Sequence, residues 1–100
     1  MGYNYETTFW QDFDFAEPFG EDSIRDTARR CFEEWKDNIL FLTELVMIIN
    51  HKCWAHYHRG NDALSDIYAD LYYEYNDKAL DYLKEKGNKD DIHYYIRTLD

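Results

Sequence analysis

Two pairs of carboxylates at helical spacing come closest, among the residues of this chain, to a catalytic arrangement. Glu34 and Asp37 stand three residues apart, and so do Glu74 and Asp77. On two helices, each spacing would place both carboxylates on one face, one turn apart. Carboxylates arranged in this way can share the ligation of a Mg²⁺ ion. A metal-dependent enzyme is therefore one interpretation of the sequence.

The two E-x-x-D pairs resemble the helix-borne carboxylates of all-α NTP pyrophosphohydrolases, a likeness that covers eight residues. It implies Mg²⁺-dependent release of pyrophosphate from a nucleoside triphosphate. The positions of the two carboxylate pairs along the predicted hairpin argue against this interpretation. In a hairpin that turns near residue 60, Asp37 and Asp77 would be offset by roughly 9 Å along the axis. We expect surface ion pairs with Arg29, Arg30 or Lys78 instead, and no enzymatic activity.

A segment rich in histidine, residues 51–58, offers a second set of metal-ligand types. Histidines that bind zinc from a single helix stand four residues apart, as in H-E-x-x-H. The histidines of this segment are spaced by two, five and seven residues. Cys53 and His56 could form half of a site, with His93 as a further ligand. We favour the alternative that His56 and His58 lie at a helix C-terminus, where the dipole stabilises an imidazolium, and we expect no metal and no cofactor.

An acidic stripe is the most regular polar feature of the chain. Its five aspartates would fall within roughly 100° of arc on one helix, and they are Asp62, Asp66, Asp70, Asp77 and Asp81. A solvated face that keeps a small domain soluble is one interpretation. The other is nucleic-acid mimicry, because carboxylates about 6 Å apart along the axis could occupy the basic cleft of a DNA-handling enzyme.

The first 22 residues hold six acidic side chains, seven aromatic ones and neither Lys nor Arg. Partial alternation over residues 3–9, followed by Pro18 and Gly20, predicts an extended or irregular arm over a helical body. Its acidic and aromatic run resembles peptides that dock into grooves of partner proteins, which makes contact candidates of Phe9, Trp10, Phe13 and Phe15. We favour an arm whose aromatic side chains cover the apolar belt at 39–49, with its acids near Arg25, Arg29 and Arg30.

Two helices in antiparallel order must position all these residues. Apolar side chains recur every three or four residues from Ile24 to Cys53, which predicts one long helix that Ser23 caps and that has a kink near residues 37–38. Gly60 ends it, and Asn61 or Asp62 caps the second helix. A third, short helix starts at Asp90 or Asp91.

The predicted fold is therefore all-α. A link of one or two residues forces the two long helices to be antiparallel. Residues 23–100 form this long helical hairpin with its short C-terminal helix, and residues 1–22 are an acidic, aromatic-rich arm packed on it. The length of 100 residues fits a single domain.

Composition excludes several classes of partner. With 21 acidic against 11 basic side chains and a formal charge of −10, the chain is poorly suited to direct contact with nucleic acid or an anionic membrane. Its longest apolar run is about half of a membrane span, and no targeting signal is apparent. We expect a soluble cytoplasmic protein with Cys31 and Cys53 as free thiols.

The segments 43–54, 67–74 and 94–100 together resemble small, acidic, uncharacterised helical proteins of phages and gut bacteria. The resemblance covers roughly residues 24–100 and transfers no catalytic residue. It implies a bacterial or phage-infected cytoplasm and a role in host interaction or in blocking a host defence enzyme. We expect a non-enzymatic protein-interaction module that self-associates through the exposed part of its apolar belt and that binds a protein partner, for example a basic nucleic-acid-binding protein.

Overall fold

The computed structural model describes residues 5–100, and it describes side chains from Phe9 onward. Every element in this range is helical, which confirms the predicted all-α class. The elements in chain order are α1 (Tyr5–Ala16), η1 (Glu17–Phe19), α2 (Glu21–Trp35), α3 (Ile39–His58), α4 (Asp62–Lys86) and α5 (Lys89–Leu99).

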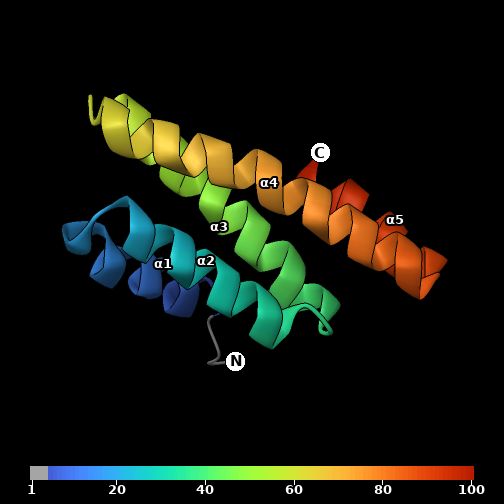
Figure 1. The fold of residues 1–100 in the computed structure, drawn as a ribbon. Helices are drawn as coiled ribbons and strands as arrows, with labels where there is room; N and C mark the ends of the chain where they lie inside the picture. Colours follow the sequence, from blue (N-terminus) through green and yellow to red (C-terminus); the bar gives the residue numbers. More distant parts are fainter. Residues whose placement is uncertain (1–4) are drawn as a thin grey trace.

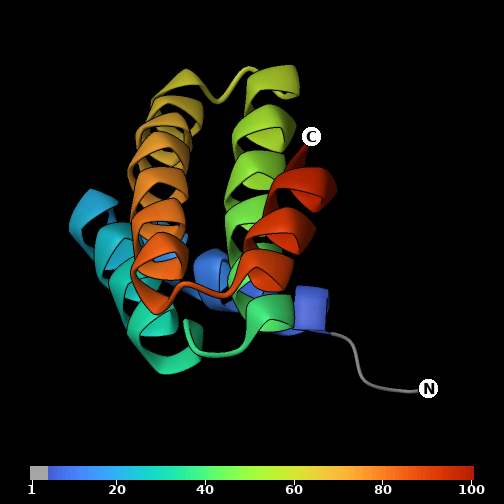
Figure 2. The same ribbon diagram turned by 90° about the vertical axis from the view of Figure 1, so that its right-hand side faces the viewer.

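The two longest helices, α3 and α4, form the predicted antiparallel hairpin (Figures 1 and 2). The turn between them contains Gly60 at a φ of 78°, a left-handed backbone conformation that glycine adopts without a steric penalty. Helices α1 and α2 pack against one side of the hairpin, whereas α5 contacts α3 and α4 alone among the described elements. The hairpin is therefore the central element, and α1, α2 and α5 all pack against it.

The predicted single helix over residues 23–59 is wrong in one respect, because it is broken rather than kinked. Helix α2 ends at Trp35, and α3 begins at Ile39 after a short turn. Asn38 has an extended backbone, and its side chain accepts hydrogen bonds from the backbone N–H groups of Leu40 and Phe41. This N-cap satisfies donors that a helix start leaves free, which is why the break falls at the asparagine.

The predicted cap at Ser23 is also wrong. Helix α2 begins at Glu21, directly after Gly20, whose φ of 101° prevents the preceding 3-10 turn from continuing. Glu21 and Asp22 occupy the first turn, where acidic side chains interact favourably with the helix dipole. Ser23 thus lies inside the helix, and its carbonyl accepts a hydrogen bond from the Thr27 hydroxyl.

The N-terminal segment is helical from Tyr5, so the prediction of an extended or irregular arm is wrong over the described residues; residues 1–4 lie outside them. Phe9, Phe13 and Ala16 recur at four and three residues, and all three are buried. This is the spacing of one helix face. Helical spacing therefore outweighs the partial alternation at the start of the chain.

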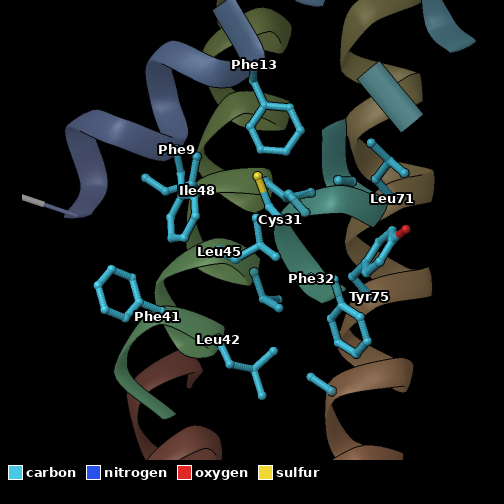
Figure 3. Close-up of a cluster of buried hydrophobic side chains, with 14 of the residues drawn as sticks. Phe9, Phe13, Cys31, Phe32, Phe41, Leu42, Leu45, Ile48, Leu71 and Tyr75 are labelled. Carbon is cyan, nitrogen blue, oxygen red and sulfur yellow. The ribbon is translucent and has the colours of Figure 1, made fainter. Parts of the chain in front are cut away.

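The core lies where α1, α2, α3 and α4 meet (Figure 3). Phe9 makes an edge-to-face contact with Phe41, at 6.1 Å between ring centroids, and Phe13 makes one with Tyr68 at 5.6 Å. The apolar belt of α3 is thus covered by the N-terminal helix, as predicted, and Leu42, Leu45 and Ile48 are fully buried within one chain. Among the described residues, no helix is both long and apolar enough to cross a membrane.

Candidate functional site

The five aspartates of the predicted stripe all lie on α4, and all five are exposed. Asp70 lies 3.9 Å from the Arg25 guanidinium, and its side chain is still 73% exposed. Within residues 9–100, no ion pair engages Asp62, Asp66, Asp77 or Asp81. The outer side of α4 therefore carries a row of carboxylates, called the acidic face below, which consists of these five residues.

A groove of about 490 Å³ runs between α3 and α4 near the hairpin turn. Helix α3 contributes Asn50, Trp54 and Tyr57 to its lining, and α4 contributes Ser65, Ala69 and Tyr73. The small side chains of Ser65 and Ala69 leave the space, and aromatic rings stand on either side of it. Trp54 and Tyr57 meet edge to face at 5.7 Å between centroids. We call this feature the aromatic groove.

The aromatic groove borders the acidic face. Tyr73 stands three residues after Asp70 and four before Asp77, and side chains at these spacings are neighbours on a helix surface. Tyr73 is 70% exposed and Trp54 is 53% exposed. The sequence did not predict this groove, because it is made by two helix segments that meet only in the folded hairpin.

Of the four aromatic residues proposed as contact candidates in the N-terminal segment, two are excluded by burial. Phe9 and Phe13 are at most 1% exposed and belong to the core. Trp10 is half-buried, and the Lys52 ammonium lies 4.7 Å from the centre of its ring. Phe15 alone of the four is exposed, at 72%.

Lys52 is the most deeply buried charged group among the described residues, at 2% exposed. It reaches from α3 to two carboxylates of the N-terminal segment, making an ion pair with Asp14 and another with Glu17 at 2.9 Å. The Tyr68 hydroxyl donates to the same Glu17 oxygen at 2.7 Å. A buried ammonium is tolerated only when it is paired and hydrogen-bonded, and these partners meet that requirement.

His56 lies in the last turn of α3, as predicted, and its buried ring completes the charged cluster. It is 4% exposed, stacks on Tyr68 at 5.7 Å between ring centroids, and has Nε2 3.0 Å from Glu17. Its Nδ1 lies 3.0 Å from the Asn61 amide nitrogen. Since the amide nitrogen of Asn61 can only donate, Nδ1 of His56 is the acceptor of that hydrogen bond. The ring proton is therefore on Nε2, which donates a hydrogen bond to Glu17.

The acid–base properties of this cluster follow from its contacts. Burial by itself raises the pKa of Glu17, but hydrogen bonds from Lys52, Tyr68 and His56 outweigh it and leave that pKa below the ordinary value of 4.5. Burial and the hydrogen bond to Glu17 raise the pKa of the Tyr68 hydroxyl. Glu17 is therefore an ionised acceptor at neutral pH, and Tyr68 is a donor.

The metal-ligand sets proposed from the sequence are not brought together. The Cys53 thiol lies 3.7 Å from the Ser65 hydroxyl, whereas both ring nitrogens of His56 are engaged by Glu17 and Asn61. Within the described part of the chain, no three His, Cys, Asp or Glu side chains are grouped closely enough to hold a metal ion.

The two E-x-x-D carboxylate pairs also stay apart. Asp37 accepts a hydrogen bond from Tyr82 and lies 3.7 Å from the Lys86 ammonium. Glu74 lies 3.5 Å from Arg25 instead. Since Glu74 and Tyr82 are separated by eight residues, or about 12 Å along the helix, the two pairs face different levels of α4. The remaining members, Glu34 and Asp77, are exposed.

The arginines near the start of α2 were expected to form ion pairs with acidic residues of the N-terminal segment. From Phe9 onward, where side chains are described, Glu21 is the only acid of that segment that does so. It pairs with Arg25 at 2.8 Å. Arg29 pairs with Asp26 of its own helix. The acids that were expected there, Asp14 and Glu17, turn to Lys52 instead. The sequence does contain a signal for the burial of Lys52, because this residue continues the buried series Phe41, Leu45 and Ile48 at helical spacing.

Both cysteines are unpaired, as predicted, and they differ in environment. Cys31 is buried, with its sulfur 3.8 Å from an Asp12 carboxylate oxygen. Burial and this carboxylate raise the pKa of the Cys31 thiol to about 12. Cys53 is partly exposed and lines the aromatic groove.

Comparison of the chain with protein-family models, with curated proteins and with solved structures found no match.

Proposed function

We propose that this chain is a non-enzymatic protein-interaction module that binds a basic protein through the acidic face of α4, in the cytoplasm of a bacterium or of a phage-infected cell. The observation that carries the proposal is the row of five exposed aspartates, of which only Asp70 has an ion-pair partner among the described residues. Basic side chains of a partner would supply the missing counter-charges.

The energetics of α4 support a role beyond solvation. Asp62, Asp66 and Asp70 stand four residues apart, and so do Asp77 and Asp81. Like charges at this spacing destabilise a helix by about 0.2–0.5 kcal/mol per pair. Helix α4 thus forms despite repulsion between its aspartates. Lys or Arg side chains of a bound partner would relieve this repulsion, so binding of the partner would also stabilise α4.

Nucleic-acid mimicry is a second candidate function, and the spacing of the acidic face favours it. Carboxylates at four-residue intervals repeat about every 6 Å along the axis, and a basic cleft that binds phosphates would accept such a row. This candidate predicts that the partner is a nucleic-acid-binding protein. It also predicts that double-stranded DNA competes with this chain for the partner.

Affinity capture with matched variants tests the proposal. The immobilised protein is incubated with nuclease-treated bacterial lysate, and each captured protein is identified, purified and measured for binding by calorimetry. A triple variant, Asp66→Asn with Asp77→Asn and Asp81→Asn, should lose binding of the purified partner. Asp70 is left intact because it contacts Arg25.

The control carries the same change in charge at exposed acids outside α4: Asp22→Asn, Glu34→Gln and Asp90→Asn. Retained binding by this control, with loss in the α4 variant, supports the acidic face. Equal binding by the two variants contradicts the proposal. Added duplex DNA separates the two candidates, since only a mimic would be displaced by it.

A further inference from the structure

The aromatic groove lies along the line where α3 and α4 pack against each other. Another stretch of the same line is covered by a helix. Helix α5 lies along α3 and α4 at the end away from the hairpin turn (Figure 2). Its buried Tyr95 donates a hydrogen bond to Asn76 of α4 at 2.8 Å. Asn76 follows Ala69, Tyr72 and Tyr73 of the groove lining on the same helix. The surface between α3 and α4 that α5 covers therefore continues, beyond the end of α5, as the aromatic groove.

The dimensions of the open half suit a further helix. The lining runs from Asn50 to Tyr57 on α3 and from Ser65 to Tyr73 on α4, which corresponds to about 12 Å or two helical turns. Two turns accommodate apolar anchors at positions i, i+3 or i+4, and i+7 of a bound helix. Helix α5 shows that this side of the hairpin accepts an amphipathic helix.

The two edges of the groove differ in charge. The α4 edge adjoins the acidic face, with Asp66 three residues from Ala69, and Asp70 and Asp77 three and four residues from Tyr73. The α3 residues that line the groove include Asn50, Trp54 and Tyr57, and none of the α3 lining residues is acidic. A ligand with positive charge along one edge alone would match this asymmetry.

We propose that the aromatic groove binds an amphipathic helix of the partner protein, with apolar anchors between Trp54 and Tyr73 and with Lys or Arg side chains along the edge that faces α4. This inference rests on the proposed function and names the shape and chemistry of the partner segment. It predicts that apolar and ionic contacts both contribute to binding. Aromatic residues are common among those that dominate binding energy at protein interfaces.

A second copy of the chain suits this groove less well than a basic helix does. A twofold-symmetric contact brings the same patch of both copies together. The acidic face adjoins the groove, so the Asp66 and Asp77 carboxylates of the two copies would approach one another. Each copy also carries a formal charge of −10. The repulsion between these carboxylates and the like net charges both oppose association of two copies through the groove, and both favour a cationic ligand there.

A designed peptide tests the inference on the full-length protein. The probe is an 18-residue amphipathic helix with Leu and Trp anchors on one face and Lys along one flanking edge; its counterpart has Glu in place of each Lys. Fluorescence anisotropy should show saturable binding of the Lys peptide, and binding of the Glu peptide should be weaker by at least about tenfold.

Two double variants separate the groove from general stickiness. Trp54→Ala with Tyr73→Ala removes one exposed ring from each edge of the groove, and should weaken binding of the Lys peptide by about tenfold or more. Phe15→Ala with Phe19→Ala removes two exposed rings of the N-terminal segment and should change it by less than about twofold. Circular dichroism confirms that each variant is folded.

Three results would overturn the inference. Absence of saturable binding of the Lys peptide is the first. Binding that the aspartate triple variant weakens but the groove variant does not is the second, and this result leaves the proposed acidic interaction surface standing. The third is a concentration-dependent dimer in sedimentation experiments that Trp54→Ala with Tyr73→Ala abolishes, because the occupant would then be a second copy.

Discussion

Lys52 links the N-terminal segment to α3 through buried ion pairs. Its ammonium group is buried between α3, α1 and η1, and its two carboxylate partners both come from the N-terminal segment. Removal of one partner from a buried ion pair leaves a charge without full compensation. The free-energy cost of this is larger than the net stabilisation that the intact pair provides. The cluster therefore couples the fold of residues 5–19 to the hairpin.

The substitution Glu17→Gln should lower the free energy of unfolding by about 3 kcal/mol. It removes one of the two carboxylates that pair with the buried Lys52 and weakens the acceptor of the Tyr68 and His56 hydrogen bonds. Urea unfolding at pH 7, followed by circular dichroism, measures the change. Glu34→Gln is the matched control, because Glu34 is exposed, and it should shift stability by no more than about 0.5 kcal/mol. Equal effects would disprove the role assigned to the cluster.

The lowered pKa of Glu17 predicts a specific dependence of stability on pH. A carboxyl group whose pKa is lower in the folded than in the unfolded chain stabilises the fold above the unfolded value, here 4.5, and loses that contribution as the pH falls through the folded value. The difference in unfolding free energy between wild type and Glu17→Gln should therefore shrink as the pH falls below 4.5. A difference that is constant from pH 7 to pH 3 would contradict this prediction.

At the scale of elements, Asn38 separates α2 from α3 and caps the second of them. Asn38→Ala should reduce the free energy of unfolding by about 1 kcal/mol, because two backbone donors lose their side-chain acceptor. Asn38→Asp keeps an acceptor oxygen and should retain most of the stability. Thermal unfolding of both variants measures the difference, and an alanine variant as stable as the aspartate variant would show that the cap contributes nothing.

Most helices of this chain could be predicted from the sequence because their signals are local. Apolar side chains at three- and four-residue spacing marked the body of α3, and Gly60 marked its end. The boundary at Asn38 was placed correctly but as a kink, since periodicity continues across the turn from Trp35 to Ile39. A stripe of apolar residues does not reveal whether the backbone between them is continuous.

The N-terminal helix was missed because two local signals conflicted. Alternation at residues 3–9 favoured an extended chain, whereas Phe9, Phe13 and Ala16 follow helical spacing. Tertiary packing decides between them, because a helix buries both phenylalanines against α3 and α4 at once. Glu17 and Lys52 were missed for a related reason: the burial of a charged group depends on partners that are distant in sequence.

At the scale of the whole molecule, α1 is an integral part of the core rather than a free arm. Phe13→Ala should lower the free energy of unfolding by about 3–5 kcal/mol, because it leaves a cavity against Tyr68. Phe15→Ala, two residues away and 72% exposed, should change it by no more than about 0.5 kcal/mol. Urea unfolding of the two variants makes the comparison, and similar values would mean that α1 does not pack as described.

The acidic face was predictable, and the aromatic groove was not. Five aspartates on one helix face can be placed from spacing alone. The groove requires the register between α3 and α4, which sets Trp54 opposite Ala69 and Tyr73. That register depends on the hairpin turn and on the covering helices together, and no single segment of the sequence encodes it.

The contrast between the two cysteines makes the native sequence suitable for site-specific chemical labelling. Near neutral pH, alkylation requires the thiolate, which the buried Cys31 sulfur, with its pKa of about 12, scarcely forms. Cys53 is partly exposed beside Trp54. A maleimide dye should therefore attach at one position, inside the aromatic groove, without any engineered cysteine. Its emission would report directly on occupancy of the groove, and peptide mapping of the conjugate would show whether Cys31 stays unmodified.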